Sequence, residues 1–318
     1  MSTMDGVRMA TSEQETPVYF PAGADTLFGV LTEPISEPRG TAAILLVGGG
    51  SIATNRNRLF VPLSRRLSAD GFHALRLDYH GVGESTGVLA RVPRVSEPFL
   101  TDLQGAVDRV RAEGTDRLLL IGSCFGARTA LSAAPGLAGV QAIVLISPPL
   151  RDLAMDEEVG TRLAYRVKGR HTIRRALSPK AFRGWRDPAA RRTYLRFLKV
   201  KTRMLLRLPA RMLRRGADDS WVSRALLEPI QALARRRVPV LLIYGTRDYH
   251  YDDFLVAQPG RLGRVLKGAP LTELVVLEGP VHGFPRVDVQ DRVLDVIYDW
   301  IERVVPRSDD GAEDVSER

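Results

Sequence analysis

The chain is short of several residue types, and each shortage limits what the protein can be. It has one cysteine among 318 residues, so it forms no internal disulfide, which suits a reducing compartment such as the cytoplasm. No CxxC pair or His/Cys cluster occurs along the sequence, so we predict no metal site and no cofactor. Aromatic residues make up only 7% of the chain and are not interleaved with the basic residues, which argues against nucleic-acid binding.

Long apolar runs are also missing. No stretch of about 18 apolar residues occurs, so the sequence predicts no membrane span. Residues 1–16 lack the apolar segment of a secretory signal, and we expect residues 1–16 and 307–318 to be disordered. The whole chain is 44% hydrophobic and 26% charged, as soluble globular proteins are. We therefore expect a cytoplasmic protein, whose oligomeric state the sequence leaves open.

Positive charge is concentrated in one segment. Residues 151–237 hold 24 Lys and Arg against 8 Asp and Glu, a balance of +16, whereas the whole chain carries +9. The remainder, with 22 basic and 29 acidic residues, is therefore at −7. Two interpretations stay open: a solvated helical surface, or a surface that attracts an acidic partner. If the segment attracts an acidic partner, the residues expected to contact that partner are Arg191, Arg192, Arg196, Lys199, Lys201 and Arg203.

Short apolar runs alternate with helical patterns, which is typical of a mostly parallel α/β sheet. An antiparallel hairpin is predicted over Pro17–Pro34. Further strands are predicted at Ala42–Val47, His73–Tyr79, Arg117–Gly122, Ala142–Ser147, Val238–Gly245 and Thr272–Gly279. Helices are predicted near Asn57–Ala69, Glu97–Glu113, Phe125–Ala134, Tyr251–Leu266 and Val287–Val305.

The segment between the sixth and seventh strands breaks this alternation. It carries helical patterns but no strand pattern, so we expect residues 151–237 to form a basic helical lid. The core domain is then expected to consist of residues 17–150 and 238–306. The alternative for the apolar residues of the lid is ordinary helix packing.

The pentapeptide GSCFG, residues 122–126, places two possible nucleophiles side by side after a strand. A strand that ends in G-x-nucleophile-x-G and turns directly into a helix is a nucleophile elbow. Gly122 and Gly126 are centred on Cys124, not on Ser123. The spacing therefore predicts a cysteine nucleophile.

An acid and a histidine follow in the order that such a site requires. Asp248 comes just after the strand that ends at Gly245, and His282 comes after the next strand. The carboxyl ends of parallel strands meet at one edge, where ligands bind in open α/β sheets. His250 is too near Asp248 in sequence to be its usual partner. We predict a Cys124–His282–Asp248 triad.

From about Val18 to Val305 the sequence resembles the α/β-hydrolase superfamily. Its GxCxG elbow is similar to that of dienelactone hydrolases. Its layout resembles the exosortase A system-associated hydrolases of the serine-aminopeptidase-like group, which carry a Gly-Gly turn after the third strand. Here Gly48–Gly50 form that turn, Arg58 and Phe60 follow at similar spacing, and Leu77–Ser85 is similar to the D-Y-R-G-x-G-x-S segment, with His80 in place of Arg. The resemblance implies an α/β-hydrolase fold.

The resemblance also implies a mechanism. Cys124 would attack a carbonyl carbon after passing its proton to His282, and the N–H of Phe125 with one from Gly50 or Ser51 would form the oxyanion hole. The expected activity is hydrolysis of an ester or thioester, and acyl carrier protein or coenzyme A is the expected carrier of the acyl group. Acyl transfer or acyl elimination on the same triad is the alternative, followed by a non-catalytic binding protein on a hydrolase fold.

Overall fold

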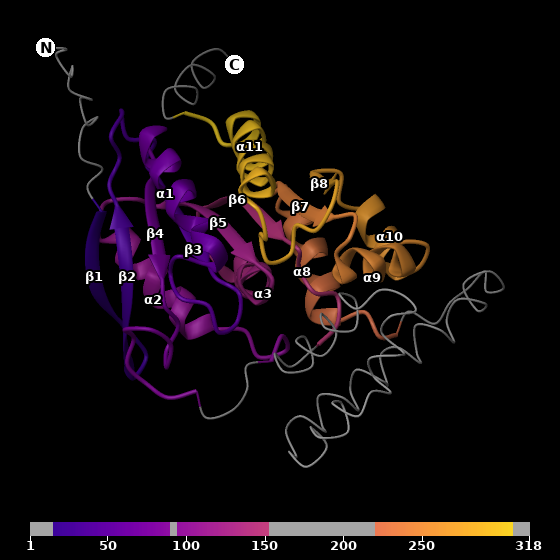
Figure 1. The fold of residues 1–318 in the computed structure, drawn as a ribbon, viewed down its shortest axis with the longest axis horizontal. Coiled ribbons are helices and arrows are strands. Elements are labelled where there is room, and N and C mark those ends of the chain that lie inside the picture. The colour runs from indigo at the N-terminus through magenta and orange to yellow at the C-terminus, as the bar shows by residue number, and fades with distance from the viewer. Residues whose placement is uncertain (1–14, 90–93, 153–219, 308–318) are drawn as a thin grey trace, which may run out of the picture.

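The computed structural model describes residues 15–89, 94–152 and 220–307, and its centre is one eight-stranded sheet (Figure 1). Across the sheet the strand order is β1-β2-β4-β3-β5-β6-β7-β8. The strands are β1 (Glu15–Ala22), β2 (Asp25–Thr32), β3 (Thr41–Leu46), β4 (His73–Leu77), β5 (Arg117–Ser123), β6 (Val140–Ile146), β7 (Val240–Gly245) and β8 (Thr272–Leu277).

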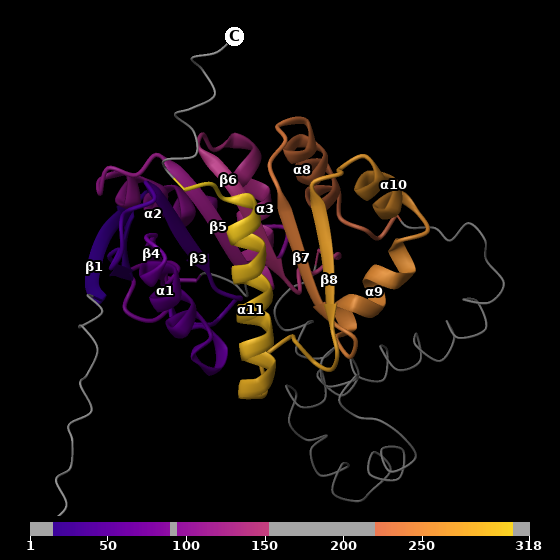
Figure 2. The same ribbon diagram turned by 90° about the horizontal axis from the view of Figure 1, so that it is seen from above.

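Helices cover both faces of this sheet (Figure 2). One face is covered by α1 and α11, and the other by α2, α3 and α8. The described helices are η1 (Arg56–Arg58), α1 (Phe60–Ala69), α2 (Leu100–Arg111), α3 (Phe125–Ala133), η2 (Ala134–Gly136), α8 (Arg224–Arg235), α9 (Tyr249–Ala257), α10 (Arg261–Lys267) and α11 (Val287–Val304). In the described part of the chain, no helix has the length and apolar character needed to cross a membrane.

Strand pairing agrees with the predicted mostly parallel sheet. β1 and β2 form the predicted antiparallel hairpin, and β2 pairs antiparallel with β4. The strands from β3 to β8 all pair in parallel. The chain places β4 on one side of β3 and β5 on the other, so the strand order reverses at β3. Ligands bind beyond the carboxyl ends of the strands at such a reversal.

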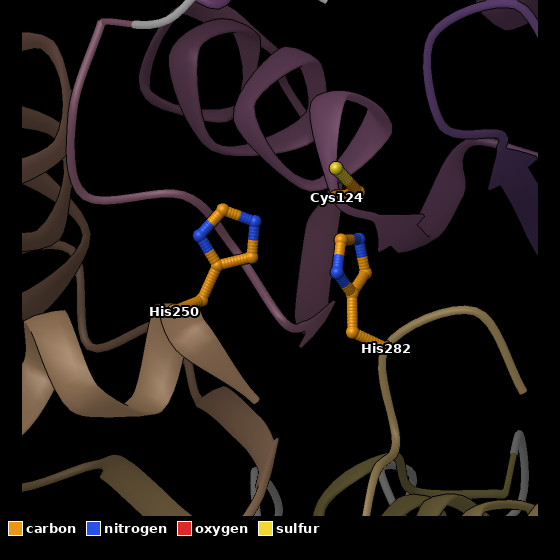
Figure 3. Close-up of side chains that lie close together, drawn as sticks. All are labelled: Cys124, His250 and His282. Atoms are coloured by element: carbon orange, nitrogen blue, oxygen red, sulfur yellow. The ribbon is translucent and has the colours of Figure 1, made fainter. Parts of the chain in front are cut away.

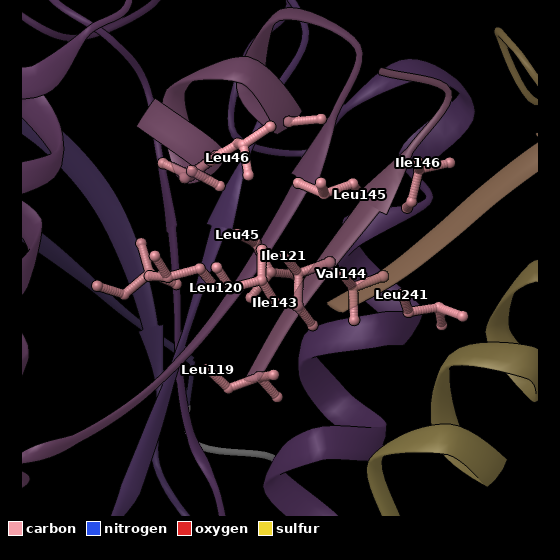
Figure 4. Close-up of a cluster of buried hydrophobic side chains, with 14 of the residues drawn as sticks. Leu45, Leu46, Leu119, Leu120, Ile121, Ile143, Val144, Leu145, Ile146 and Leu241 are labelled. Atoms are coloured by element: carbon pink, nitrogen blue, oxygen red, sulfur yellow. The ribbon is translucent and has the colours of Figure 1, made fainter. Parts of the chain in front are cut away.

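The core lies along the central strands. Every residue of β3 and β7 is buried, because helices exclude water from both faces of the sheet. This explains why these strands read as continuous apolar runs instead of alternating patterns. Figure 4 shows side chains of β3, β5, β6 and β7 packed together, among them Leu45, Ile121, Ile143 and Leu241.

Two predicted helices differ from the structure for local reasons. The helix predicted over Tyr251–Leu266 is two helices, α9 and α10, separated at Pro259 and Gly260, where proline prevents continuation of the helix. The helix predicted over Asn57–Ala69 starts only at Phe60. Asn57 and Arg58 have φ angles of 50° and 62°, which are incompatible with a right-handed helix.

Part of the predicted basic lid packs on the core. α8 lies within residues 151–237, yet its residues Leu226, Ile230 and Leu233 are buried, and it contacts α3 and α10. Residues 153–219, with the arginines and lysines singled out above, lie outside the described residues. The lid therefore stays a prediction for that range.

We predict that Gly126→Ala strongly destabilises the protein. An alanine Cβ at residue 126 would overlap the backbone carbonyl oxygen of Leu46, and backbone atoms cannot easily move aside. The free energy of unfolding, measured by urea denaturation, should fall by about 2 kcal/mol or more.

Gly136→Ala is the matched control, because nothing lies within 4 Å of the Cβ it would add. Its free energy of unfolding should change by no more than about 0.5 kcal/mol. Equal stability of the two variants would contradict the close approach of α3 to β3.

Candidate active site

Cys124 occupies the turn between β5 and α3. Its backbone has φ 54° and ψ −113°, a region that non-glycine residues avoid and that costs about 1–3 kcal/mol. The turn is held by the Cys124 N–H, which donates to the Ile146 carbonyl oxygen at 2.8 Å, and by the Arg128 N–H, which donates to the Cys124 carbonyl oxygen at 3.3 Å. Ser123 instead ends β5 and pairs with Ile146 in the sheet. The strained position therefore belongs to Cys124.

The two glycines of the motif are needed for different close approaches. A Cβ on Gly122 would lie 2.5 Å from the Cα and the nitrogen of Ala127, in the first turn of α3. A Cβ on Gly126 would overlap the end of β3. Neither residue has a positive φ angle, so space and not backbone conformation excludes a side chain at both positions.

Two histidines lie beside Cys124 (Figure 3). The Sγ atom of Cys124 and one ring nitrogen each of His250 and His282 lie within 4.8 Å of one another. His282 comes from the loop after β8, and His250 from the first turn of α9. The two imidazole rings have centroids 4.9 Å apart, and Tyr249 contacts both of them. The structure thus brings Cys124 and His282 together as predicted, with His250 as an unforeseen third member.

One sulfur and two nitrogens are donors that zinc accepts. These atoms all lie within 4.8 Å of one another, and donors bound to one zinc lie at most about 4.4 Å apart, because Zn–S and Zn–N bonds are about 2.3 and 2.1 Å. The three side chains therefore lie close to the spacing of zinc ligands. The same arrangement places a thiol beside an imidazole base.

Asp248 holds the loop that carries His282. Its Oδ1 accepts hydrogen bonds from the backbone N–H groups of Val281 at 3.1 Å and His282 at 2.9 Å. Its Oδ2 accepts from the Gly245 N–H at 2.9 Å and the Ser147 hydroxyl at 3.0 Å. The carboxylate is 3% exposed. Asp248 therefore fixes the position of the histidine through its backbone.

Burial shifts the pKa values of Asp248 and His282, each away from its charged form. Burial raises the pKa of Asp248 to about 6, although the hydrogen bonds donated to its carboxylate act in the opposite direction. Burial, assisted by the positive charge of Arg56, lowers the pKa of His282 to about 3. At neutral pH His282 is therefore uncharged and able to accept a proton.

The oxyanion-hole prediction rests on α3 and the Gly48–Gly50 turn. α3 begins at Phe125, so the Phe125 N–H is one of the first-turn donors without an intrahelical acceptor, at the positive end of the helix dipole. The Ser51 N–H donates to the Gly48 carbonyl oxygen at 3.0 Å and is thus engaged within the turn. Gly50, with φ 71°, stays the predicted second donor.

A small pocket of about 10 Å³, room for about one water molecule, opens on Cys124 and His282. Sequence reasoning missed several of the residues near these groups. Asn55 and Arg56 line the pocket beside the predicted glycine turn, and Ser147 supports Asp248 from the end of β6. None of these three residues belongs to a recognisable motif. Only the fold brings these segments together.

A comparison with protein families identifies the chain's relationship. Residues 40–253 match the family described as serine aminopeptidase, S33. The chain belongs to this family. The eight-stranded, mostly parallel sheet with helices on both faces is its α/β-hydrolase fold, as the sequence predicted. Members of this family are hydrolases, including esterases and peptidases.

Solved structures support the same fold. An esterase of Pyrococcus furiosus, Pf2001, aligns with a TM-score of 0.62 at 17% identity and covers 92% of each chain. A proline iminopeptidase of Mycobacterium smegmatis aligns at 0.58 with 16% identity, over 91% of this chain and 98% of that one. Est1E of Butyrivibrio proteoclasticus, bound to ferulic acid, aligns at 0.55 with 17% identity, over 91% and 99%. No curated protein matches the sequence. At such identities these solved structures establish the fold and no particular substrate.

We predict that His282 supplies no imidazolium to stabilise a Cys124 thiolate in the resting protein at neutral pH. An imidazolium stabilises a neighbouring thiolate, but a histidine whose pKa is about 3 is uncharged above that pH. The rate of alkylation by iodoacetamide should therefore rise by roughly tenfold per pH unit between about pH 4 and 7, as the thiolate fraction does.

Cys124 is the only cysteine, so intact mass reports its alkylation alone. Glutathione is the control for the intrinsic pH dependence of alkylation. A rate that is independent of pH across this range would contradict the prediction, because it would indicate a preformed thiolate–imidazolium pair.

Proposed function

We propose that the protein hydrolyses an ester or thioester through a covalent acyl-cysteine intermediate. Cys124 acts as the nucleophile, His282 as the general base and acid, and Asp248 as the residue that positions His282. The observation that carries the proposal is the strained backbone of Cys124, which presents a thiol within 4.8 Å of a ring nitrogen of His282. Neutral His282 is in the protonation state that a base requires.

In the first half of the reaction the thiol proton moves to the ring nitrogen of His282, and Sγ attacks the substrate carbonyl carbon. The carbonyl oxygen becomes an oxyanion that accepts hydrogen bonds from the N–H of Phe125 and of the glycine turn. Each such donor contributes about 3 kcal/mol of transition-state stabilisation. The imidazolium then returns its proton to the leaving alkoxide or thiolate as the carbon–leaving-group bond breaks.

In the second half, His282 removes a proton from water, and the hydroxide oxygen attacks the thioester carbon. The tetrahedral intermediate collapses with release of the Cys124 thiolate, which takes the proton back, and of the carboxylic acid. Asp248 stabilises the transient imidazolium by keeping the loop in place and by its negative charge. No other co-reactant is required.

The family takes its name from serine enzymes, so the cysteine assignment needs separate support. It is supported by the elbow, because Ser123 continues the β5–β6 ladder while Cys124 adopts the positive φ angle. Like the exosortase A system-associated hydrolases it resembles, the chain has a cysteine elbow and a glycine turn after the third strand. We propose membership of that subgroup on the same residues.

We predict that Cys124→Ala lowers kcat/KM for a p-nitrophenyl ester and an acyl thioester by a factor of about 10³ or more, because it removes the nucleophile. Intact mass spectrometry of the wild type should show an acyl adduct, and peptide mapping should assign it to Cys124.

Ser123→Ala is the matched control, because it removes the neighbouring hydroxyl but leaves the turn unchanged. It should retain kcat/KM within a few-fold of the wild type. Loss of activity in Ser123→Ala, with activity retained in Cys124→Ala, would assign the nucleophile to serine and overturn the proposal.

Acyl transfer is the second candidate function, and burial of the thiol favours it. Cys124 is 4% exposed and the pocket over it is narrow, so water has limited access to an acyl group on sulfur. We propose that the acyl donor is then a thioester of coenzyme A or of acyl carrier protein.

If acyl transfer dominates, we expect the acyl adduct on Cys124 to persist in buffer and to discharge when an amine, thiol or alcohol acceptor is added. Rapid-quench mass spectrometry measures both rates. An adduct that water removes as fast as any acceptor would leave hydrolysis as the function.

A further inference from the structure

Arg56 is a basic side chain in the pocket of Cys124 and His282 that the proposed mechanism does not use. It lines this pocket together with the two proposed catalytic groups. Its Nη1 lies 3.9 Å from where a Cβ would stand on Gly283, directly after His282. Its residue is exposed, and within residues 15–89, 94–152 and 220–307 no carboxylate forms an ion pair with it. The guanidinium is thus available to a ligand.

The loop that carries Arg56 is strained and firmly attached. Of the four consecutive residues 55–58, three have positive φ angles: Asn55 with 58°, Asn57 with 50° and Arg58 with 62°. Such conformations persist only where surrounding contacts enforce them, and they concentrate at functional sites. The Asn57 amide donates to the carbonyl oxygens of Gly283 at 3.1 Å and Phe284 at 2.8 Å, which joins this loop to the histidine loop.

The position of the Arg56 charge disfavours the proposed reaction unless something compensates it. The charge lowers the pKa of His282 and so opposes the protonation of His282 that the thiol must supply. The groups that face His282 are Cys124, His250, Tyr249, Arg56 and, through the backbone, Asp248. Of these, Arg56 alone is always cationic. An anion bound to Arg56 would remove this penalty only when substrate is present.

We propose that Arg56 forms an anion subsite that binds a carboxylate or phosphate group of the substrate close to the reacting carbonyl. The substrate class is therefore an acyl compound with an anionic group near the scissile bond. A guanidinium pairs with either anion through two parallel hydrogen bonds. This statement about substrates rests on the proposed function, whereas the anion subsite itself does not.

The subsite is tested without turnover by a pair of thiol reagents that differ in charge. Iodoacetate carries a carboxylate next to its reactive carbon, and iodoacetamide is its neutral counterpart. The ratio of their rates with Cys124, divided by the same ratio for glutathione, measures attraction of the anion. We expect a value of about 10 or more for the wild type, in line with a close charge pair in a partly buried site.

Arg56→Gln should lower this normalised ratio to about 1, at which Cys124 and glutathione discriminate equally between the reagents. Arg56→Lys should give an intermediate value, because lysine keeps the charge but not the paired hydrogen bonds. Arg58→Gln is the matched control: it removes the same charge from the same loop, outside the pocket, and should retain the wild-type ratio. A ratio that is unchanged in both Arg56 variants, or lowered equally in Arg58→Gln, overturns the subsite.

The substrate class is tested with a thioester whose acyl chain ends in a carboxylate and the methyl ester of the same compound. The wild type should prefer the carboxylate in kcat/KM, and Arg56→Gln should reduce that preference by about tenfold or more. A matched phosphate-bearing thioester distinguishes the two anions. Failure of all turnover would contradict the proposed function and leave the alkylation ratio to decide the subsite. Turnover without charge preference would contradict the substrate class alone.

Discussion

The contact between the first turn of α3 and the end of β3 is the constraint on which the site depends. Gly126 packs its backbone against the Leu46 carbonyl, and Gly122 packs against Ala127. This close approach forces the sharp turn and the positive φ angle of Cys124. The strain of about 1–3 kcal/mol is maintained by the buried strands on either side, where apolar side chains are removed from water. The thiol is thus held in place by the core.

Electrostatics gives the site its second constraint. His282 and Asp248 are both buried enough for their pKa values to move away from the charged forms, and Arg56 adds a positive charge near the histidine. Four N–H and O–H donors compensate the Asp248 carboxylate, so its negative charge is tolerated at neutral pH. The resting site therefore holds one compensated anion, one neutral base and one exposed cation. This combination leaves the site ready to receive a negative group.

A buried arginine connects the nucleophile helix to the chain on both sides of residues 153–219. Arg128 in α3 donates hydrogen bonds to the Pro149 carbonyl oxygen at 2.9 Å and the Ser223 hydroxyl at 2.8 Å, and it pairs with Asp152 at 3.1 Å. Removal of this side chain would take a hydrogen-bond donor from two buried groups, the Pro149 carbonyl and the Ser223 hydroxyl. The helix that positions Cys124 thus also holds Asp152 and Ser223, two described residues that flank positions 153–219 in the sequence.

The sequence by itself determined the sheet and the chain order of the site. Continuous apolar runs specify central strands of a covered parallel sheet, and glycines spaced around Cys124 specify the elbow, because both signals are local. The apolar pattern alone does not separate α9 from α10, because Pro259 and Gly260 end the helix between them. The contact of His250 with His282, the support of Asp248 by Ser147 and the entry of Arg56 into the pocket all arise from the folded arrangement of the strands. Each of these contacts joins loops from different strands. Their positions depend on how the strands are ordered in space, which no short stretch of sequence encodes.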